Sequence, residues 1–406
     1  MKYVIIGVGA AGITAAEELR KLDENSSITM VSEDQFVHSR CMLHKYISHE
    51  RDEKTLNFTS ENFFEDNNIN WKKIGVKKID TSKKEVILLN DDIEKYDKLL
   101  IATGANSFIP PVGDFRKATN VFGLRHLRDA QEIDKMAEKA EKILIVGSGL
   151  VGLDAAHGLL ERGKDVTIVE MADSILPVQL NPCAAYEYQK RFEKAGAKFY
   201  LGCKADKAEC LEDGKIHAVT FDTGETVPCD MIIVAAGVRP AISLIEGSGI
   251  EVDRGIVVDD FMKTNVEDIY AAGDVTGLSG IWPNAMKQGM VAARNMANMS
   301  EKYEDKFAMK NTINFYGLVS LCLGNIKEEE NDKVVEEEDS KNYKRAVLTE
   351  DGKLKGILLQ GDISNAGIWQ YIIKNKISVD FKENIFDITF ADFYGTGEKG
   401  KYVWKY

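Results

Sequence analysis

The sequence predicts an α/β protein in which two similar strand–turn–helix units are followed by a smaller α+β region. Two glycine motifs support this prediction, and each follows an apolar run with the length of a buried strand: Gly7-Val8-Gly9-Ala10-Ala11-Gly12 and Gly147-Ser148-Gly149-Leu150-Val151-Gly152. After each motif, a second apolar run ends in an acid, at Glu33 and at Glu170. Recurrence of the whole unit predicts two parallel sheets with crossover helices.

Each glycine motif has the spacing that binds the pyrophosphate of a dinucleotide. The first glycine permits a tight turn, the second lets the backbone approach the phosphates, and the third lets the helix pack closely on the strand. The N-terminus of that helix attracts the phosphate charge. A carboxylate at the end of the next strand accepts hydrogen bonds from ribose hydroxyls and repels a 2′-phosphate. We therefore predict two Rossmann-like domains, each of which binds a dinucleotide.

Later apolar runs predict the closing strand of each unit and the elements of a third domain. Strands are expected at 97–105 and 231–237, and each ends in small residues that let the chain pass close to a ligand. A short strand that ends at Asp274 resumes the first domain, so the second domain is inserted into the first. The expected third, α+β domain comes after a helix at 282–299 and consists of strands at 312–323, 343–348 and 354–359 and a helix at 365–374.

Charge and composition exclude several classes of function. The 406 residues are 44% hydrophobic and 29% charged, which is typical of a soluble globular protein with two or three domains. The 52 Lys and Arg against 65 Asp and Glu give a net charge of -13, which would repel nucleic acid. Apolar runs of about four to eight residues are too short to cross a membrane. The lack of a basic-then-apolar leader predicts a cytoplasmic protein.

Cysteine and histidine spacing predicts no metal site. No two of the six cysteines form a C-x-x-C pair, which argues against zinc, an iron–sulfur cluster and a local redox disulfide. The six histidines also lack metal-binding spacing, and we expect structural or surface roles for them. The acidic stretch at 327–339 is expected to form a solvated hairpin or loop.

On these motifs the chain resembles, over essentially its whole length, the two-dinucleotide flavoproteins of the pyridine nucleotide–disulfide oxidoreductase family. Within that family it is most similar to NADH:rubredoxin reductases and to the flavin module of NADH-dependent nitrite reductases. The closer resemblance is carried by Arg125-His126-Leu127-Arg128-Asp129-Ala130, by Trp282 with Lys287-Gln288-Gly289, and by 356–367. In this family the first glycine motif holds FAD and the second holds the nicotinamide cofactor.

The resemblance implies the domain boundaries and the residues that contact each cofactor. The expected domains are an FAD-binding domain in two parts (1–110 and 241–305), an NAD-binding domain (111–240) and a C-terminal α+β domain (306–406). The implied FAD contacts are Gly7, Gly9, Ala11, Gly12, Glu33, Arg40, Val76, Ala102, Thr103, Gly104, Arg125 and Asp274. The implied contacts to the nicotinamide cofactor are Gly147, Gly149, Val151, Gly152, Glu170 and Gly237. No basic residue closely follows Glu170, which favours NADH over NADPH.

Three residues are candidates for the chemistry at the flavin. Lys45 matches a lysine that related reductases place beside the flavin ring, where a cation would stabilise the reduced, negatively charged form. Asp154 stands where relatives usually have Glu, and we expect it to pair with Lys45. Cys41 occupies the position of the redox-active thiol in single-cysteine members, but its neighbours Arg40 and Met42 resemble members that have Pro there. A nearby cation would stabilise its thiolate.

The expected function is transfer of electrons from NADH through FAD to a small redox protein such as rubredoxin. The first alternative is a single-cysteine NADH oxidase, or a disulfide or coenzyme A disulfide reductase, that works through Cys41. The second alternative is a flavoprotein whose redox state regulates the binding of a partner. The expected state of association is a monomer or a homodimer.

Overall fold

The computed structural model describes residues 1–304, 310–398 and 401–404. Two compact units form within this range. The first contains Met1–Val169 and the segment from Ala197 to residue 304, and the second contains Glu170–Gly196 and the segment from residue 310 onward. The domain boundaries at 110 and 240 stay a prediction, and the boundary at 305 lies outside the described residues.

The first sheet of the first unit is a five-stranded parallel sheet in the order β18-β7-β1-β2-β3. Its strands are β1 (Lys2–Ile6), β2 (Ser27–Val31), β3 (Ile69–Lys72), β7 (Lys98–Ile101) and β18 (Ile269–Ala271). Because successive side chains of a strand point to opposite faces, Tyr3 and Ile5 join one core cluster and Val4 and Ile6 join another. Both faces are buried, which explains the uninterrupted apolar run of β1.

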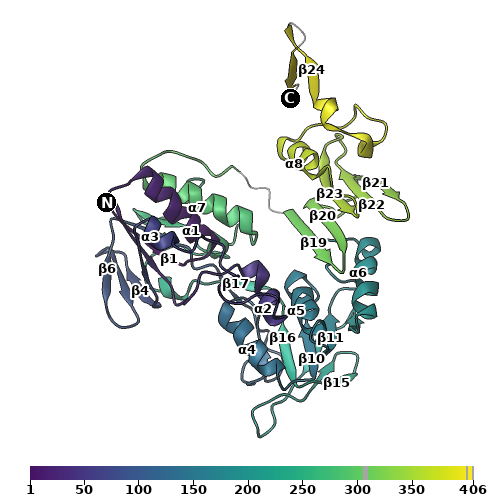
Figure 1. The fold of residues 1–406 in the computed structure, drawn as a ribbon, viewed down its shortest axis with the longest axis horizontal. Helices are drawn as coiled ribbons and strands as arrows, with labels where there is room; N and C mark the ends of the chain where they lie inside the picture. The colour runs from purple at the N-terminus through teal and green to yellow at the C-terminus, as the bar shows by residue number, and fades with distance from the viewer. Residues whose placement is uncertain (305–309, 399–400, 405–406) are drawn as a thin grey trace. The chain divides into compact units, whose positions relative to one another are not determined.

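Each face of this sheet is covered by a different layer. Helices α1 (Ala10–Leu22) and α7 (Trp282–Met296) lie side by side on one face (Figure 1). A small antiparallel sheet of β4 (Val76–Asp80), β5 (Glu85–Leu88) and β6 (Ile93–Lys95) contributes to the core on the other face. Helix α7 ends at Met296, before the predicted 299, because Asn298 adopts a left-handed conformation with φ of 64°.

The second sheet repeats this plan in the order β12-β11-β10-β16-β9. Strand β10 pairs in parallel with β11 and β16, as β1 does with β2 and β7. The strands are β9 (Val121–Phe122), β10 (Lys142–Val146), β11 (Asp165–Glu170), β12 (Lys198–Leu201) and β16 (Met231–Val234). Helices α4 (Leu127–Ala137) and α5 (Leu150–Leu160) accompany this sheet, and β13 (Ala205–Lys207), β14 (Ala218–Phe221) and β15 (Thr226–Pro228) form a second small sheet. The predicted α/β fold with two parallel sheets is therefore confirmed.

A two-stranded antiparallel ribbon carries the chain between the two large sheets. Strand β8 (Ala105–Ser107) follows β7, and strand β17 (Val238–Pro240) follows β16 and pairs with β8. Two short helices, α2 (Leu43–Ile47) and α3 (Phe63–Asp66), also belong to this unit. Both crossings of the chain thus lie in one ribbon, which we call the crossover ribbon.

The second unit is built on an antiparallel sheet in the order β19-β20-β23-β22-β21. Its strands are β19 (Lys310–Phe315), β20 (Leu318–Gly324), β21 (Lys333–Glu338), β22 (Tyr343–Leu348) and β23 (Leu354–Gln360). The unit also contains α6 (Pro182–Lys194), α8 (Ala366–Asn375) and a hairpin of β24 (Tyr394–Thr396) and β25 (Tyr402–Trp404). The predicted strand at 312–323 is instead a hairpin, because Tyr316 and Gly317 both have positive φ and form a tight turn.

Helix α6 packs on this sheet although it lies far from it in the sequence. The hydroxyl of the fully buried Tyr188 is 2.9 Å from Ser320 Oγ and within hydrogen-bonding distance of the backbone oxygens of Ile313 and Leu318. Phe192 makes an edge-on contact with Phe315 at 5.2 Å. The apolar side of α6 is therefore buried against β19 and β20.

Strand β21 forms one edge of this sheet and carries a run of acidic side chains. Glu336, Glu337 and Glu338 are exposed, and Glu336 and Glu337 pair with Arg345 and Lys344 of the neighbouring β22. The acidic stretch expected to be a solvated hairpin or loop thus forms the largely exposed first strand of the hairpin of β21 and β22. Among the residues that the structure describes, no helix is both long enough and apolar enough to span a bilayer.

Candidate functional site

The first glycine motif forms the turn between β1 and α1, and its backbone leaves no room for side chains. Gly7 has a φ of 111°, and a Cβ on it would lie 2.3 Å from the carbonyl oxygen of Ala102. A Cβ on Gly12 would lie 2.1 Å from the carbonyl oxygen of Gly7. The amide of Ala102 donates to Ile6, and that of Gly7 donates to Val31, so the carboxyl ends of three strands meet here.

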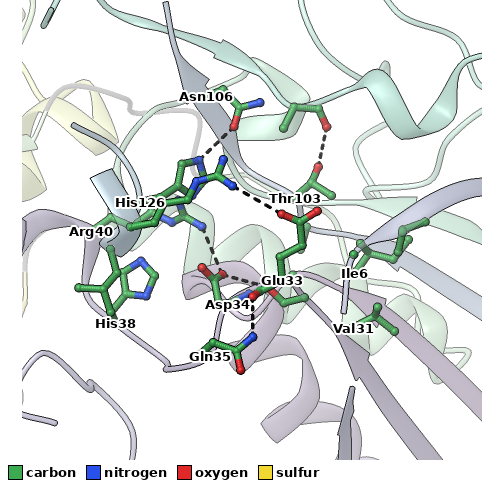
Figure 2. Close-up of a pocket in the computed structure, with 18 of the residues that line it drawn as sticks. Ile6, Val31, Glu33, Asp34, Gln35, His38, Arg40, Thr103, Asn106 and His126 are labelled. Atoms are coloured by element: carbon green, nitrogen blue, oxygen red, sulfur yellow. Dashed lines mark hydrogen bonds and ion pairs between the residues drawn. The ribbon is translucent and has the colours of Figure 1, made fainter. Parts of the chain in front are cut away.

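A cavity of about 480 Å³ opens at these strand ends (Figure 2). Six of the residues predicted to contact FAD line it: Gly7, Glu33, Arg40, Val76, Ala102 and Thr103. Thr103 is held by a hydrogen bond of 2.9 Å from its hydroxyl to the carbonyl oxygen of Ala241. Residues from both predicted halves of the FAD-binding domain thus surround one cavity.

The other residues predicted to contact FAD lie close to this region but do not line the cavity. Arg125 forms an ion pair with Asp274, and its Nε donates to the carbonyl oxygen of Ala105 at 3.2 Å. Gly104 has a φ of 71°, and a Cβ on it would approach Arg125 Nη2 to 3.9 Å. Gly9 precedes α1, in which Ala11 and Gly12 are buried.

Several cavity residues were missed by sequence reasoning. Chief among them are His38, Asn106, His126 and Arg128, and Figure 2 shows the first three at the cavity wall. Arg128 Nη1 lies 3.6 Å from the carboxylate of Glu33, the acid predicted to bind ribose. The position of these residues in the sequence could have identified them, because they follow strand ends or precede a helix, where ligands bind in α/β sheets.

Arg40 shows why the cavity fits a pyrophosphate. Its guanidinium lines the cavity, and the nearest carboxylate among the described residues is that of Asp34, 4.0 Å from Nη2. A Cβ on Gly9 would lie 3.9 Å from Arg40 Nε. A largely buried guanidinium without a close counter-ion favours an anionic ligand. The open backbone at Gly9 allows phosphate groups to approach it.

His38 offers a hydrogen-bond acceptor to the same ligand. The side chain is only 4% exposed, and its Nδ1 lies 3.0 Å from the carbonyl oxygen of Phe36. Because a carbonyl oxygen only accepts, Nδ1 carries the proton and Nε2 is the acceptor. Within the described part of the chain, Nε2 has no hydrogen-bond partner. Burial, followed by the charge of Arg40, lowers the pKa of His38, so the ring is neutral and suits a ligand hydroxyl.

The second glycine motif has the same geometry between β10 and α5. Gly147 has a φ of 105°, and a Cβ on Gly152 would lie 2.0 Å from the carbonyl oxygen of Gly147. A Cβ on Gly149 would meet no described atom within 4 Å, and the same holds for Gly237, although its φ of 97° disfavours a side chain. Val151 is 41% exposed. The motif therefore leaves open space above Gly149, as a bound pyrophosphate requires.

Glu170 ends β11 and belongs to the second unit. Its carboxylate oxygen Oε1 accepts a hydrogen bond of 2.9 Å from the backbone amide of Ala172. This contact holds the carboxylate at the end of the strand, which is the position predicted to bind the ribose of NADH.

Lys45 and Asp154 do not form the expected ion pair. Lys45 Nζ lies 2.6 Å from the carboxylate of Glu50, whereas the carboxylate of Asp154 lies 3.5 Å from His44 Nδ1. Aspartate is one methylene shorter than glutamate, which accounts for its shorter reach. Burial raises the pKa of Asp154 to about 7, opposed by the charge of Lys45. Burial, followed by Lys45 and His157, lowers the pKa of His44 to about 4.

Cys41 is exposed and lies in the short turn Arg40–Met42 that precedes α2. Desolvation by the surrounding atoms is the main cause that raises the pKa of its thiol, and the charge of Asp154 adds to the effect. Arg125 and Arg40 act in the opposite direction but do not reverse it. The pKa of the thiol therefore stays above its ordinary value, and a redox role of Cys41 stays a prediction.

One group of described residues has ligand atoms close enough for a metal ion: His49, Asp134 and Glu138. Arg162 already neutralises both carboxylates, with distances of 2.7 Å to Asp134 and 2.9 Å to Glu138. We assign no metal site to this cluster.

Comparison with known sequences reveals similarity to NADH-dependent oxidoreductases. The family model described as pyridine nucleotide-disulphide oxidoreductase matches residues 1–289. The chain is 31% identical over 373 residues to nitrite reductase [NAD(P)H] of Bacillus subtilis, covering 89% of this chain but 46% of that protein. It is 30% identical over 386 residues to the epsilon subunit of NADH-dependent phenylglyoxylate dehydrogenase of Aromatoleum evansii, covering 92% of this chain and 91% of the subunit. It is 34% identical over 324 residues to an NADH oxidase of Methanocaldococcus jannaschii, covering 75% and 71% of the two chains.

Solved structures show the same fold. The ferredoxin reductase of the CYP199A2 system from Rhodopseudomonas palustris superimposes with a TM-score of 0.84 at 23% identity, covering 93% of this chain and 95% of that one. NADH:rubredoxin oxidoreductase from Clostridium acetobutylicum superimposes with a TM-score of 0.76 at 25% identity, covering 93% and 96%. The family and these relatives indicate FAD and NADH as cofactors. With the family model matched over 289 residues, the chain belongs to the pyridine nucleotide-disulphide oxidoreductase family.

Proposed function

We propose that this protein oxidises NADH and passes the electrons through FAD, one at a time, to a small redox protein of the rubredoxin type. The overall reaction is NADH + 2 oxidised carriers → NAD⁺ + 2 reduced carriers + H⁺, in which each carrier gains one electron. Bound FAD supplies the step from a hydride donor to a one-electron acceptor. The residues of the chain bind and orient the two cofactors.

The observation that carries this proposal is the state of Cys41. Its thiol has a raised pKa, and none of the six cysteines is in a disulfide. A thiol that stays protonated is a poor nucleophile and a poor electron relay. Direct transfer from the flavin to a partner's redox centre needs no such thiol. The similarity to NADH:rubredoxin oxidoreductase supports a rubredoxin-like acceptor.

A thiol-based NADH oxidase or disulfide reductase is the second candidate. Cys41 is exposed, and Arg125 and Arg40 act against the rise of its pKa. The similarity to an NADH oxidase supports this alternative. In this mechanism the Cys41 sulfur attacks the acceptor, so the reaction depends on that residue.

Anaerobic stopped-flow spectroscopy distinguishes the two candidates. The FAD-loaded protein is mixed with NADH and then with oxidised rubredoxin, oxygen or coenzyme A disulfide. The proposal expects fast reoxidation by rubredoxin alone, and equal rates for wild type, Cys41→Ser and the control Cys183→Ser, which changes another exposed cysteine. Fast reoxidation by oxygen or the disulfide that is lost only in Cys41→Ser would establish the thiol mechanism instead.

A further inference from the structure

Among the described residues, Arg40 makes its hydrogen bonds through one terminal nitrogen, Nη1. Arg40 Nη1 lies 2.8 Å from His126 Nδ1 and 3.2 Å from the carbonyl oxygen of Arg125. Among described residues no hydrogen bond is made by Nε or by Nη2, whose closest carboxylate is the ion-pair partner Asp34 at 4.0 Å. Two of the five guanidinium N–H groups are therefore used to fix the side chain, and the others are left for a ligand.

The contact with Arg40 defines the protonation state of His126. A guanidinium only donates, so His126 Nδ1 must have a free lone pair. The proton then sits on Nε2, which donates to Asn106 Oδ1 at 3.0 Å (Figure 2). Burial, followed by the charges of Arg40, Arg128 and Arg125, lowers the pKa of His126 to about 2. The ring is therefore an acceptor for Arg40 over the whole physiological pH range.

The backbone of His126 is also fixed. Asp129 Oδ2 accepts hydrogen bonds from the amides of Arg125 and His126, at 2.9 and 2.8 Å, at the start of α4. Asn106, which accepts from His126 Nε2, is the middle residue of β8 and pairs with Arg239 of β17. The series of contacts Arg40–His126–Asn106 thus connects the cavity to the crossover ribbon.

We propose that His126 is a positioning residue that aims Arg40 at the pyrophosphate of FAD and links this site to the crossover ribbon through Asn106. The two N–H groups of Nη1 are oriented by the protein, so the remaining donors are held in place before the ligand arrives. Pre-orientation lowers the entropy lost on binding and slows release. The proposal rests on FAD binding and is independent of which acceptor receives the electrons.

Two substitutions of His126 separate its two contacts. His126→Asn keeps an oxygen near the position of Nδ1 and can still accept from Arg40, whereas His126→Gln places its amide near Nε2 and leaves Arg40 without an acceptor. We expect FAD release from His126→Asn within about threefold of wild type and release from His126→Gln at least about tenfold faster, since a lost hydrogen bond to a charged group has this size. Release is followed as the rise of free-flavin fluorescence after dilution. His49→Gln, at an exposed histidine that pairs with Asp134, is the matched control.

Asn106→Asp tests the tautomer. A carboxylate still accepts from Nε2 but raises the pKa of His126. It acts against the charges of Arg40, Arg125 and Arg128, with neutral His38 alongside and the carboxylate of Asp129 at the His126 backbone amide. Protonation of Nδ1 removes the acceptor for Arg40. As the pH falls below about 5.5, FAD release from Asn106→Asp should therefore begin to accelerate at a higher pH than release from wild type or Asn106→Ala.

Hydrogen exchange tests the link to the ribbon. FAD should slow the exchange of amides at 105–107 and 238–240 in wild type and His126→Asn, and much less in His126→Gln. Equal FAD release from His126→Asn and His126→Gln, or equal protection of the ribbon in both, would overturn the proposal. The rate of carrier reduction per bound FAD is measured separately, so a wrong acceptor does not affect this result.

Discussion

At the scale of single residues, Asp154 shows how burial changes the charge near the second glycine motif. An unfolded carboxyl group titrates near pH 4, whereas burial raises the pKa of Asp154 to about 7 in the folded protein. The folded state therefore binds this proton more tightly, and its stability decreases as the pH rises between these values. His44 has a lowered pKa and therefore acts in the opposite direction. Its contribution to the stability of the folded state increases as the pH rises from about 4 to 6.5.

Asp154→Asn should remove the pH dependence of stability that Asp154 causes. Without FAD, the unfolding free energy of the variant should equal that of wild type near pH 4. At pH 8 it should be higher than that of wild type by on the order of 2 kcal/mol, since the amide stays neutral. Urea denaturation at both pH values measures this difference. Asp213→Asn, at a surface carboxylate that pairs with His217, is the control and should show no such increase. An equal effect of Asp154→Asn at both pH values would contradict the assignment.

His38→Leu should affect the FAD-bound protein more than the FAD-free protein. The substitution removes a buried acceptor that has no partner among the described residues, which offsets the loss of the hydrogen bond from Nδ1 to Phe36, so the FAD-free protein should be about as stable as wild type. FAD loses a hydrogen bond, and its affinity should fall about five- to tenfold. Thermal unfolding with and without FAD measures both effects. A variant that binds FAD as tightly as wild type would show that Nε2 does not contact the cofactor.

The sequence predicts the glycines of the site because their role depends only on local spacing. Gly7 and Gly12 are constrained by atoms of the same motif and of the adjacent strand end, which the pattern itself implies. His38 and His126 could not be assigned this way, because their function depends on burial and on partners distant in sequence, such as Arg40 for His126. The reach of a side chain also escapes sequence pattern, as the unformed pair of Lys45 and Asp154 shows.

At the scale of elements, the close packing of α1 and α7 depends on one position. A Cβ on Gly289 of α7 would lie 2.2 Å from the backbone oxygen of Ala11, and backbone atoms cannot rotate away. Gly367 of α8 is also helical, but a Cβ there would meet no described atom within 4 Å. These two glycines therefore separate the effect of packing from the effect of helix propensity.

Gly289→Ala should destabilise the protein by about 2–4 kcal/mol, because α7 has to move away from α1. Gly367→Ala should stabilise it by about 0.5–1 kcal/mol, since alanine loses less conformational entropy in a helix. Denaturant unfolding of both variants gives the two values. Similar effects of both substitutions would mean that the helices are not packed as closely as the structure has them.

Element boundaries are predicted well where apolar periodicity decides them and poorly where turns do. The apolar runs before both glycine motifs coincide with β1 and β10 because both faces of these strands are buried. The region at 312–323 is predicted as one strand because the apolar pattern continues through Tyr316. In the structure the chain turns at Tyr316, whose backbone is left-handed with φ of 50°.

At the scale of the whole molecule, α6 makes the second unit discontinuous in sequence. Its buried residues Tyr188 and Phe192 contact β19 and β20 of the same unit. A fragment of residues 1–304 lacks these strands and leaves the apolar side of α6 exposed. We expect this fragment to aggregate and to bind a hydrophobic fluorescent dye more strongly than the full chain.

The same fragment with Tyr188→Lys and Phe192→Glu provides the control. These changes place charge on the exposed helix side, so they should restore solubility and remove dye binding. In the full chain they should instead abolish folding of the second unit. Sedimentation and dye fluorescence of the four proteins measure this. A soluble unmodified fragment that binds no dye would contradict the packing of α6.

The acidic edge strand β21 has a consequence for how copies of the chain behave at high concentration. An edge strand offers unpaired backbone groups to any other strand, but two β21 edges would bring Glu337 and Glu338 of one copy against those of another. Like-charge repulsion opposes that pairing at neutral pH and weakens as salt rises or as the carboxyl groups become protonated. Ionic strength and acidity therefore act as a control on strand-to-strand association, and purified protein remains dispersed most easily in dilute, neutral buffer.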